Sequence, residues 1–224
     1  MIIECRDVCK TYMADGLEVK AADHVNLEIR AGDFVTILGH SGSGKTTLLS
    51  LIGGLTSPDS GQILIAGRDS WSENDRTISQ VRNGTIGFVF QFASLIPTLT
   101  ALENLLLPLS FGRSKKDGRS RALELLEAVG LIEKVNAFPA QLSGGQQRRI
   151  AIARAFINEP DIILADEPTG DLDETTEDEI LRFFKGYNRA GTTFVVVTHN
   201  SDLAESQDRA RIIQMRNGRV EERG

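Results

Sequence analysis

The clearest chemistry lies in a glycine-rich run that follows the apolar stretch 34–38 and ends in a lysine and two threonines. Its small residues let successive backbone N–H groups point inward at an anion, and the helix that starts near Lys45 adds the positive end of its dipole. Lys45 places a charge on the terminal phosphates, and Thr46 offers a hydroxyl to Mg²⁺. The pattern therefore predicts a nucleoside triphosphate site formed by Gly39, Ser41, Gly42, Ser43, Gly44, Lys45, Thr46 and Thr47.

A second group of candidate residues is an acidic pair at the end of an apolar strand, Asp166 and Glu167. Because residues in a strand alternate between faces, the two carboxylates need not do the same job. One carboxylate beside a phosphate loop can hold Mg²⁺ through water, and the next can polarise a water for attack on the γ-phosphate. An acidic pair at a strand end is by itself usually the start of a loop, so it is the phosphate loop that favours the catalytic interpretation.

Gln91 and His199 each follow a further predicted strand. A neutral amide at Gln91 can contact both a metal and a water, and the imidazole of His199 could reach a γ-phosphate. Either residue alone is more often structural. Their shared position favours one site, because ligands of open parallel sheets bind at the carboxyl ends of the strands.

A third motif, Leu142-Ser143-Gly144-Gly145-Gln146, opens a helix. A serine followed by two glycines can make a second anion-binding helix start, or it can be a flexible link with a serine cap. On the first interpretation the chain carries two phosphate cradles but a single phosphate-loop lysine.

Length and composition limit the class of protein to which this chain can belong. The chain has 224 residues, of which 41% are hydrophobic, so it can form one large α/β domain with a buried core. Its net charge of −6 argues against a general nucleic-acid surface. Cys5 and Cys9 are four residues apart with no other cysteine or histidine nearby, which fits a reducing, cytoplasmic setting. No segment has the pattern of a signal peptide or a membrane span.

The first part of the chain reads as short strands separated by turns. The predicted strands are 2–8, 24–29, 34–38 and 62–66, with a helix at 45–52. Residues 68–83 are polar and indicate a surface connection, which is followed by a strand at 84–90.

The pattern changes after residue 91. Leucines recur at helical spacing between 92 and 142, which predicts a mostly helical insertion. Strands are expected again at 161–165 and 192–197, each after a helix, as in a parallel sheet. Asn217-Gly218 marks the turn of a terminal hairpin.

Taken together and in this order, the motifs resemble those of the ATP-binding cassette (ABC) ATPase family. The resemblance covers essentially the whole chain, and LSGGQ shortly before an ILADEP strand is its most specific part. It implies an α/β fold: a RecA-like P-loop NTPase core with an antiparallel β subdomain and a helical insertion. The chain would then be a single ABC ATPase domain, 1–224, with its core and β subdomain in 1–91 and 143–224 and a helical subdomain in 92–142.

The resemblance also implies roles for the candidate residues. Two cassettes of this family pack head to tail as a homodimer, so that ATP lies between the phosphate loop of one and the LSGGQ of the other. Lys45 would bind phosphates, Thr46 and Gln91 would ligate Mg²⁺, and Asp166 would act on it through water. Glu167 would be the general base and His199 the γ-phosphate sensor. The opposite subunit's ATP would contact Ser143, Gly144, Gly145 and Gln146.

Two more residues acquire an expected role from the same resemblance. In Asp171-Leu172-Asp173, which resembles the loop that crosses the dimer interface, Asp173 holds the acid position. Tyr12 matches the aromatic residue on which adenine stacks, although a half-buried strand tyrosine would look the same.

Residues 95–104 resemble one branch of the family, the ATPases of macrolide exporters, lipoprotein-release complexes and the cell-division complex (MacB/LolD/FtsE). In that branch the integral-membrane permease is a separate chain, which would hold this cassette at the cytoplasmic face of the inner membrane. Export or lipoprotein release is the first interpretation. The alternative is a regulatory mechanotransmitting ATPase of cell-division type with no transported substrate. A cassette acting on DNA or ribosomes is disfavoured by the acidic balance and the absence of a coiled-coil insertion.

Overall fold

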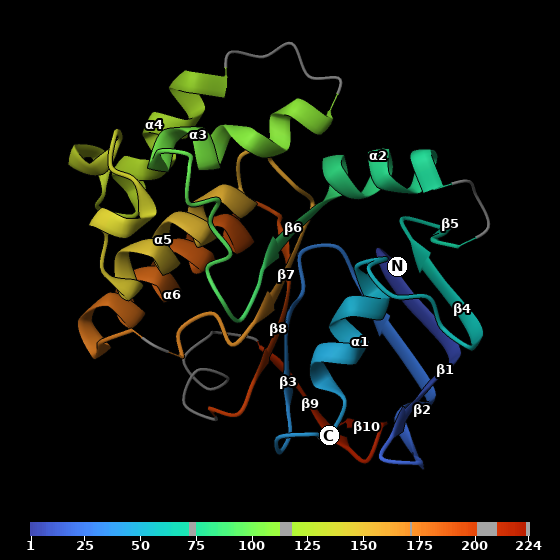
Figure 1. The fold of residues 1–224 in the computed structure, drawn as a ribbon. Helices are drawn as coiled ribbons and strands as arrows, with labels where there is room; N and C mark the ends of the chain where they lie inside the picture. The colour runs from blue at the N-terminus through green and yellow to red at the C-terminus, as the bar shows by residue number, and fades with distance from the viewer. Residues whose placement is uncertain (72–74, 113–117, 171, 201–209, 223–224) are drawn as a thin grey trace. The chain divides into compact units, whose positions relative to one another are not determined.

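The computed structural model describes residues 1–71, 75–112, 118–170, 172–200 and 210–222 (Figure 1). The chain forms two compact units. Unit 1 comprises residues 1–82 and 193–224, and unit 2 comprises residues 83–192. The division expected from the sequence, with a helical part at 92–142, remains a prediction about subdomains.

Unit 1 contains an antiparallel sheet with the strand order β2-β1-β4-β5. Its strands are β1 (Ile3–Ala14), β2 (Leu17–Ile29), β4 (Ser60–Ile65) and β5 (Arg68–Asp69). The β1–β2 hairpin turns at Asp15 and Gly16, whose φ values of 50° and 78° suit a tight turn of the primed type. The side of this sheet that carries Ile3, Ile29 and Ile63 is buried.

Unit 1 also contains the parallel strands that lead to the phosphate loop. Strand β3 (Phe34–Leu38) pairs in parallel with β8 (Thr193–Thr198) on one side and with β9 (Arg211–Arg216) on the other. Strand β10 (Arg219–Glu222) closes the expected hairpin through Asn217 and Gly218. β3 and β8 are mostly apolar and are buried along their whole length, as strands covered on both faces are. Helix α1 (Lys45–Ile52) follows β3 and contacts β2, β4 and β8.

Unit 2 contains a parallel strand pair and a group of helices (Figure 1). Helices α3, α4 and α5 contact one another, and α5 also contacts β6. α5 is buried on most sides through Ile150, Ala151, Ile152 and Ala153, which makes it the central helix of the group. The elements of this unit are β6 (Ile86–Val89), α3 (Ala101–Leu106), η1 (Leu107–Phe111), α4 (Gly118–Ala128), η2 (Ile132–Lys134), η3 (Pro139–Gln141), α5 (Gly144–Ala155), β7 (Ile162–Asp166) and α6 (Glu174–Arg189).

Two expectations about the elements were wrong. The polar stretch 68–83 is not a plain connection, because a helix, α2 (Asp75–Thr85), occupies much of it and shortens the strand expected at 84–90 to β6. The strands expected at 2–8 and 24–29 are each much longer, since they extend into a hairpin whose outer part is exposed on both faces. The other strands, the helix at 45–52 and the helical character of 92–142 are confirmed. Among the described residues, no helix is both long enough and apolar enough to cross a bilayer.

Candidate functional site

The phosphate loop lies between β3 and α1, where two glycines are required by close packing. A Cβ on Gly44, whose φ is 103°, would lie 2.0 Å from the carbonyl oxygen of Ala21, and one on Gly39 would lie 2.4 Å from that of Met215. Gly42 has a φ of 76°, and nothing lies within 4 Å of its Cβ position. The loop thus packs against β2 and β9 at its ends and is open in the middle, which leaves room for an anion.

Two polar side chains of this loop suit a phosphate chain. Lys45 is 8% exposed, and its Nζ donates to the carbonyl oxygens of Gly39 (2.8 Å) and His40 (3.1 Å). The Oγ of Ser43 is buried and has no hydrogen-bond partner among the residues that the structure describes. A buried polar atom without a partner is costly, and a phosphate oxygen would satisfy both groups. Ser41 on the loop and Thr46 in the first turn of α1 are exposed, and Thr47 is half-buried.

His199 lies beside the start of this loop. Leu38 at the end of β3 is in register with Thr198 at the end of β8. Gly39 and His199 therefore leave adjacent parallel strands at the same level, as the sequence predicts, and His199 is exposed. This edge of unit 1 has the place of a ligand site in an open parallel sheet.

Tyr12 lies in the outer half of β1, where Asp59 fixes the backbone. The Asp59 carboxylate accepts from Lys10 Nζ (2.7 Å) and from the Thr11 N–H (2.7 Å), and its own N–H donates to the carbonyl of Cys9 (2.9 Å). The hydrogen bond from Lys10, and to a smaller extent that from the Thr11 N–H, holds the pKa of Asp59 below its ordinary value. The Lys10 ammonium lies 5.7 Å from the centre of the Tyr12 ring, which is substantially exposed. The ring is thus available for stacking.

In unit 2 the ends of two paired strands carry the other candidates. Val89 of β6 is in register with Ala165 of β7, so Gln91 and the acidic pair follow neighbouring parallel strands at one edge. Asp166 is buried as the last residue of β7, whereas Gln91 is exposed. Glu167 is half-buried and has a φ of 44°, a backbone conformation that costs a non-glycine residue about 1–3 kcal/mol and is typical of functional sites.

The Ser143–Gln146 turn forms the N-terminus of α5 as a reciprocal cap. Ser143 Oγ accepts from the Gln146 N–H (3.2 Å), and the Gln146 side chain accepts from the Ser143 N–H (3.0 Å). Gly144 has open space where a Cβ would be, and the Gly145 Cβ position meets a side-chain atom of Leu172 at 3.6 Å. The capping interpretation is therefore observed in the structure, and the open glycines remain compatible with an anion.

Asp173 caps helix α6. Its carboxylate accepts from the Thr176 hydroxyl (2.7 Å) and N–H (3.0 Å), and these bonds hold its pKa below the ordinary value of 3.8. Asp171, the other acid of this loop, lies outside the described residues.

The predicted magnesium ligands are divided between the units: Thr46 belongs to unit 1, and Gln91 and Asp166 to unit 2. In unit 2, Gln91 and Asp166 lie at one strand edge, and in unit 1, Thr46 lies in the first turn of α1, next to the phosphate loop. Oxygen ligands of these types, an alcohol, an amide and a carboxylate, are those that Mg²⁺ prefers.

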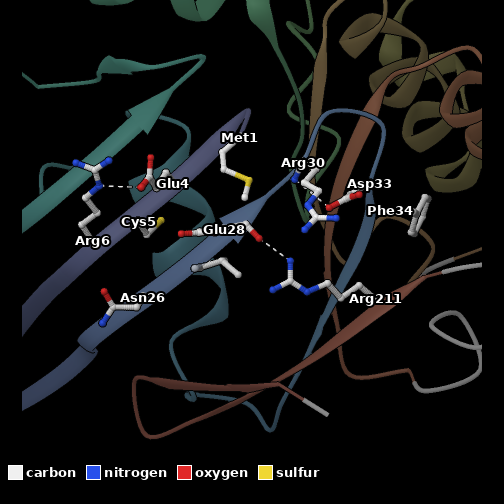
Figure 2. A pocket seen from close by; sticks show the side chains of 11 residues that line it. Met1, Glu4, Cys5, Arg6, Asn26, Glu28, Arg30, Asp33, Phe34 and Arg211 are labelled. Atoms are coloured by element: carbon white, nitrogen blue, oxygen red, sulfur yellow. Dashed lines mark hydrogen bonds and ion pairs between the residues drawn. The ribbon is translucent and has the colours of Figure 1, made fainter. Parts of the chain in front are cut away.

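A pocket of about 680 Å³ lies elsewhere in unit 1 (Figure 2). Phe34, the first residue of β3, lines it, so the pocket is at the amino end of the strand whose carboxyl end carries the phosphate loop. Two of its three arginines are engaged locally: Arg6 pairs with Glu4 (2.8 Å), and Arg211 donates to the carbonyl of Glu28 (2.5 Å). This pocket is therefore not the predicted nucleotide site.

Sequence reasoning gives Arg148 no functional role. It is buried on α5, and its guanidinium donates to the carbonyl oxygens that follow β6 and β7, among them those of Gln91 and Glu167. A basic residue on a helix face that is otherwise apolar was the available signal.

Comparisons with known proteins agree with this geometry. A family model described as ABC transporter matches residues 22–170. An uncharacterized ABC transporter ATP-binding protein of Thermotoga maritima is 48% identical over 221 residues, which are 98% of this chain and 94% of that protein. The macrolide export ATP-binding/permease protein MacB of Syntrophobacter fumaroxidans is 44% identical over 98% of this chain, which spans only 31% of that protein.

Solved structures give the same result. The ATP-binding cassette MJ0796, in a dimeric post-hydrolysis state bound to ADP and Pi, superposes with a TM-score of 0.91 at 44% identity, covering 99% of each chain. A second dimeric structure of MJ0796, described as a bacterial ABC transporter cassette, has a TM-score of 0.92 at 45% identity. The predicted fold class, a P-loop NTPase core with an antiparallel β subdomain and a helical insertion, is confirmed by these structures.

Proposed function

This chain belongs to the family of ABC transporter ATP-binding proteins and is an ATPase cassette, and from that premise we propose that it works as a homodimer driving a separate export-type permease. The observation that carries the proposal is the presence of two phosphate-type helix starts in one chain. One is the loop before α1, and the other is the capped turn before α5. In a head-to-tail dimer each ATP would be held by one of each kind.

Binding of the triphosphate begins at the phosphate loop. The Lys45 ammonium would exchange the carbonyls of Gly39 and His40 for phosphate oxygens, and Ser43 Oγ would gain the partner it lacks among the described residues. The adenine would stack on Tyr12, which follows the backbone N–H of Thr11 that Asp59 holds in place. We assign the magnesium to Thr46, Gln91 and Asp166, where the ion would neutralise charge on the β- and γ-phosphates.

Hydrolysis requires a base and a residue that senses the γ-phosphate. We assign the base to Glu167, because the carboxylate follows the buried Asp166 at the end of β7 and its backbone is held in an unusual conformation. His199, exposed beside the start of the phosphate loop, is assigned to the γ-phosphate. Ser143, Gly145 and Gln146 would complete the site of the other subunit.

The permease contact is assigned to unit 2, which presents several large apolar side chains to solvent. Phe92 is 72% exposed and Phe111 is 70% exposed, and Ile96, Ile132 and Phe138 are also exposed. In the proposed complex these side chains would be buried against the permease. The similarity to a macrolide export ATP-binding/permease protein favours export over the regulatory alternative. The cassette would lie on the cytoplasmic face of the membrane, bound through the permease.

The proposal is tested with Glu167→Gln, which removes the base but keeps the volume of the side chain. We expect ATP binding to persist, hydrolysis to fall steeply, and a dimer to accumulate with ATP and Mg²⁺ on size-exclusion chromatography with light scattering. The same variant with Ser143→Arg, which blocks the second half of the site, should remain monomeric with ATP. A Glu167→Gln protein that hydrolyses ATP normally, or that never dimerises, would contradict the proposal.

A further inference from the structure

Arg148 is a buried cation in the middle of the candidate machinery of unit 2. It lies on α5, two residues after Gln146, and is only 4% exposed. A guanidinium stays charged in proteins, so burying it is unfavourable unless its N–H groups find acceptors. The acceptors that it finds are informative about its role.

The guanidinium bridges two chain segments. Nη1 donates to the carbonyls of Phe90 and Gln91, which directly follow β6. On its other side Nε donates to the carbonyl of Pro168 (3.0 Å), and Nη2 donates to the carbonyls of Asp166 and Glu167, which end and follow β7. All these acceptors are main-chain carbonyls, so these bonds fix where the backbone of each segment lies.

The same contacts hold a strained backbone. Glu167 has a φ of 44°, a conformation that persists only when its surroundings enforce it. Its carbonyl accepts from both Arg148 and the Gly170 N–H (3.3 Å). Arg148 therefore helps to set the direction in which the Glu167 carboxylate leaves the chain.

We infer that Arg148 is a positioning residue for ATP hydrolysis: it holds the main chain at Gln91 and at Glu167 in a fixed relation and ties both to the helix that begins at Ser143. This inference rests on the proposed roles of those three residues. Because a rigid fork makes the bridge, a movement of α5 would be transmitted to both strand ends together. A change at the Ser143 turn would thereby reach the base and the proposed metal ligand.

The first test separates binding from chemistry. Arg148→Met keeps most of the volume but removes every donor. We expect kcat to fall about 100-fold, the size of loss that misplaced catalytic groups cause. The affinity for ATP, measured without Mg²⁺ so that hydrolysis does not intervene, should change less than about threefold, because the phosphate loop belongs to other elements. Arg148→Lys keeps the charge but not the fork, and we expect a smaller loss of kcat, about tenfold.

The matched control is Arg121→Met. Arg121 is a half-buried arginine of α4 in the same unit and donates to the Tyr187 hydroxyl (2.5 Å), away from the strand ends. The Arg121→Met substitution should lower the melting temperature, while kcat of the folded variant stays near the wild-type value. If Arg148→Met shows only a lower melting temperature with unchanged kcat, the inference is overturned. If Arg148→Met does not fold, the same comparison is made with Arg148→Lys, and wild-type kcat in that variant overturns it.

The second test is a double-mutant cycle with Glu167→Gln. Because Arg148 holds the main chain at Glu167 as well as at Gln91, Arg148→Met should lower the residual activity of Glu167→Gln by clearly less than the roughly 100-fold expected in the wild-type background. Independent, multiplicative losses would show that Arg148 does not act through the carboxylate. Failure of the proposed function looks different, because then Glu167→Gln alone would hydrolyse ATP at the wild-type rate.

Discussion

Asn104 is the side chain whose replacement tests the packing of unit 2 most sharply. It lies on α3 with 0% exposure, and its amide makes four hydrogen bonds to the loop before the helix. Oδ1 accepts from the Ile96 N–H (2.8 Å), and Nδ2 donates to the carbonyls of Ile96 (3.2 Å), Leu99 (3.0 Å) and Thr100 (3.0 Å). One side chain thus holds the backbone of residues 96–100.

The magnitude follows from this inventory. A protein hydrogen bond contributes about 1 kcal/mol net, and a buried group left without a partner costs about 1–3 kcal/mol. Because Ile96 is exposed, water can reach part of this loop and satisfy some of the backbone groups that lose their partner. We therefore expect Asn104→Ala to lower the free energy of unfolding by about 2–4 kcal/mol.

Asn104→Asp distinguishes hydrogen bonding from simple loss of volume. The carboxylate could still accept from the Ile96 N–H, but it would face the three carbonyls to which the amide donates, and it would be buried. Asp should therefore destabilise more than Ala, although it is nearly isosteric with Asn. The assay is urea unfolding at pH 7 followed by far-UV circular dichroism. A loss below about 0.5 kcal/mol for Ala, the range of ordinary surface changes, or a milder effect of Asp than of Ala, would refute the reasoning.

Three further predictions concern unit 1 and the carboxylates. Gly44→Ala should destabilise the nucleotide-free protein far more than Gly42→Ala. A Cβ at position 44 would meet a carbonyl oxygen at 2.0 Å, whereas an alanine at position 42 adds only the strain of a left-handed backbone, about 1–2 kcal/mol. Equal melting temperatures of the two variants would contradict this. Asp59→Ala should weaken ATP binding by up to about tenfold but leave the binding of inorganic tripolyphosphate unchanged, because the substitution loosens only the backbone next to Tyr12. Equal losses of affinity for the two ligands in calorimetry would exclude a role of Asp59 in adenine binding. The ion pairs and caps lower the pKa values of four carboxyl groups, those of Asp23, Asp59, Glu103 and Asp173. Such groups contribute stability that is present above their unfolded pKa of about 4 and is lost as the pH falls through the folded pKa, so the free energy of unfolding should drop below about pH 4. A free energy of unfolding that stays flat from about pH 5 to pH 3 would contradict these interactions.

The motifs whose residue types determine the local backbone could be predicted from the sequence. The phosphate loop, the end of β7 and the terminal hairpin lie where the residues predict, because glycines, buried apolar runs and an Asn-Gly turn each determine local backbone geometry. The register of β3 with β8, which brings Gly39 and His199 to one edge, also follows from parallel pairing.

The missed elements lack that local signal or depend on distant contacts. The outer part of the β1–β2 hairpin is exposed on both faces, so its residues do not alternate between apolar and polar, and its one local signal is the Asp15-Gly16 turn. The helix α2 is polar, and a polar stretch of this kind indicates a surface connection as readily as a helix. Arg148 could not be assigned, since its acceptors lie 18–58 residues away in the chain.

The central claim, that each ATP is cleaved between two copies of this chain, is tested most directly by mixing two inactive variants. Lys45→Ala damages the phosphate loop, and Ser143→Arg damages the turn before α5, so each variant alone should hydrolyse almost no ATP. A mixed dimer has one intact composite site, so activity should return on mixing, and it would reach about a quarter of the wild-type rate if the subunits pair at random. Full activity of Ser143→Arg alone, or no recovery in a mixture that forms mixed dimers, would contradict the account.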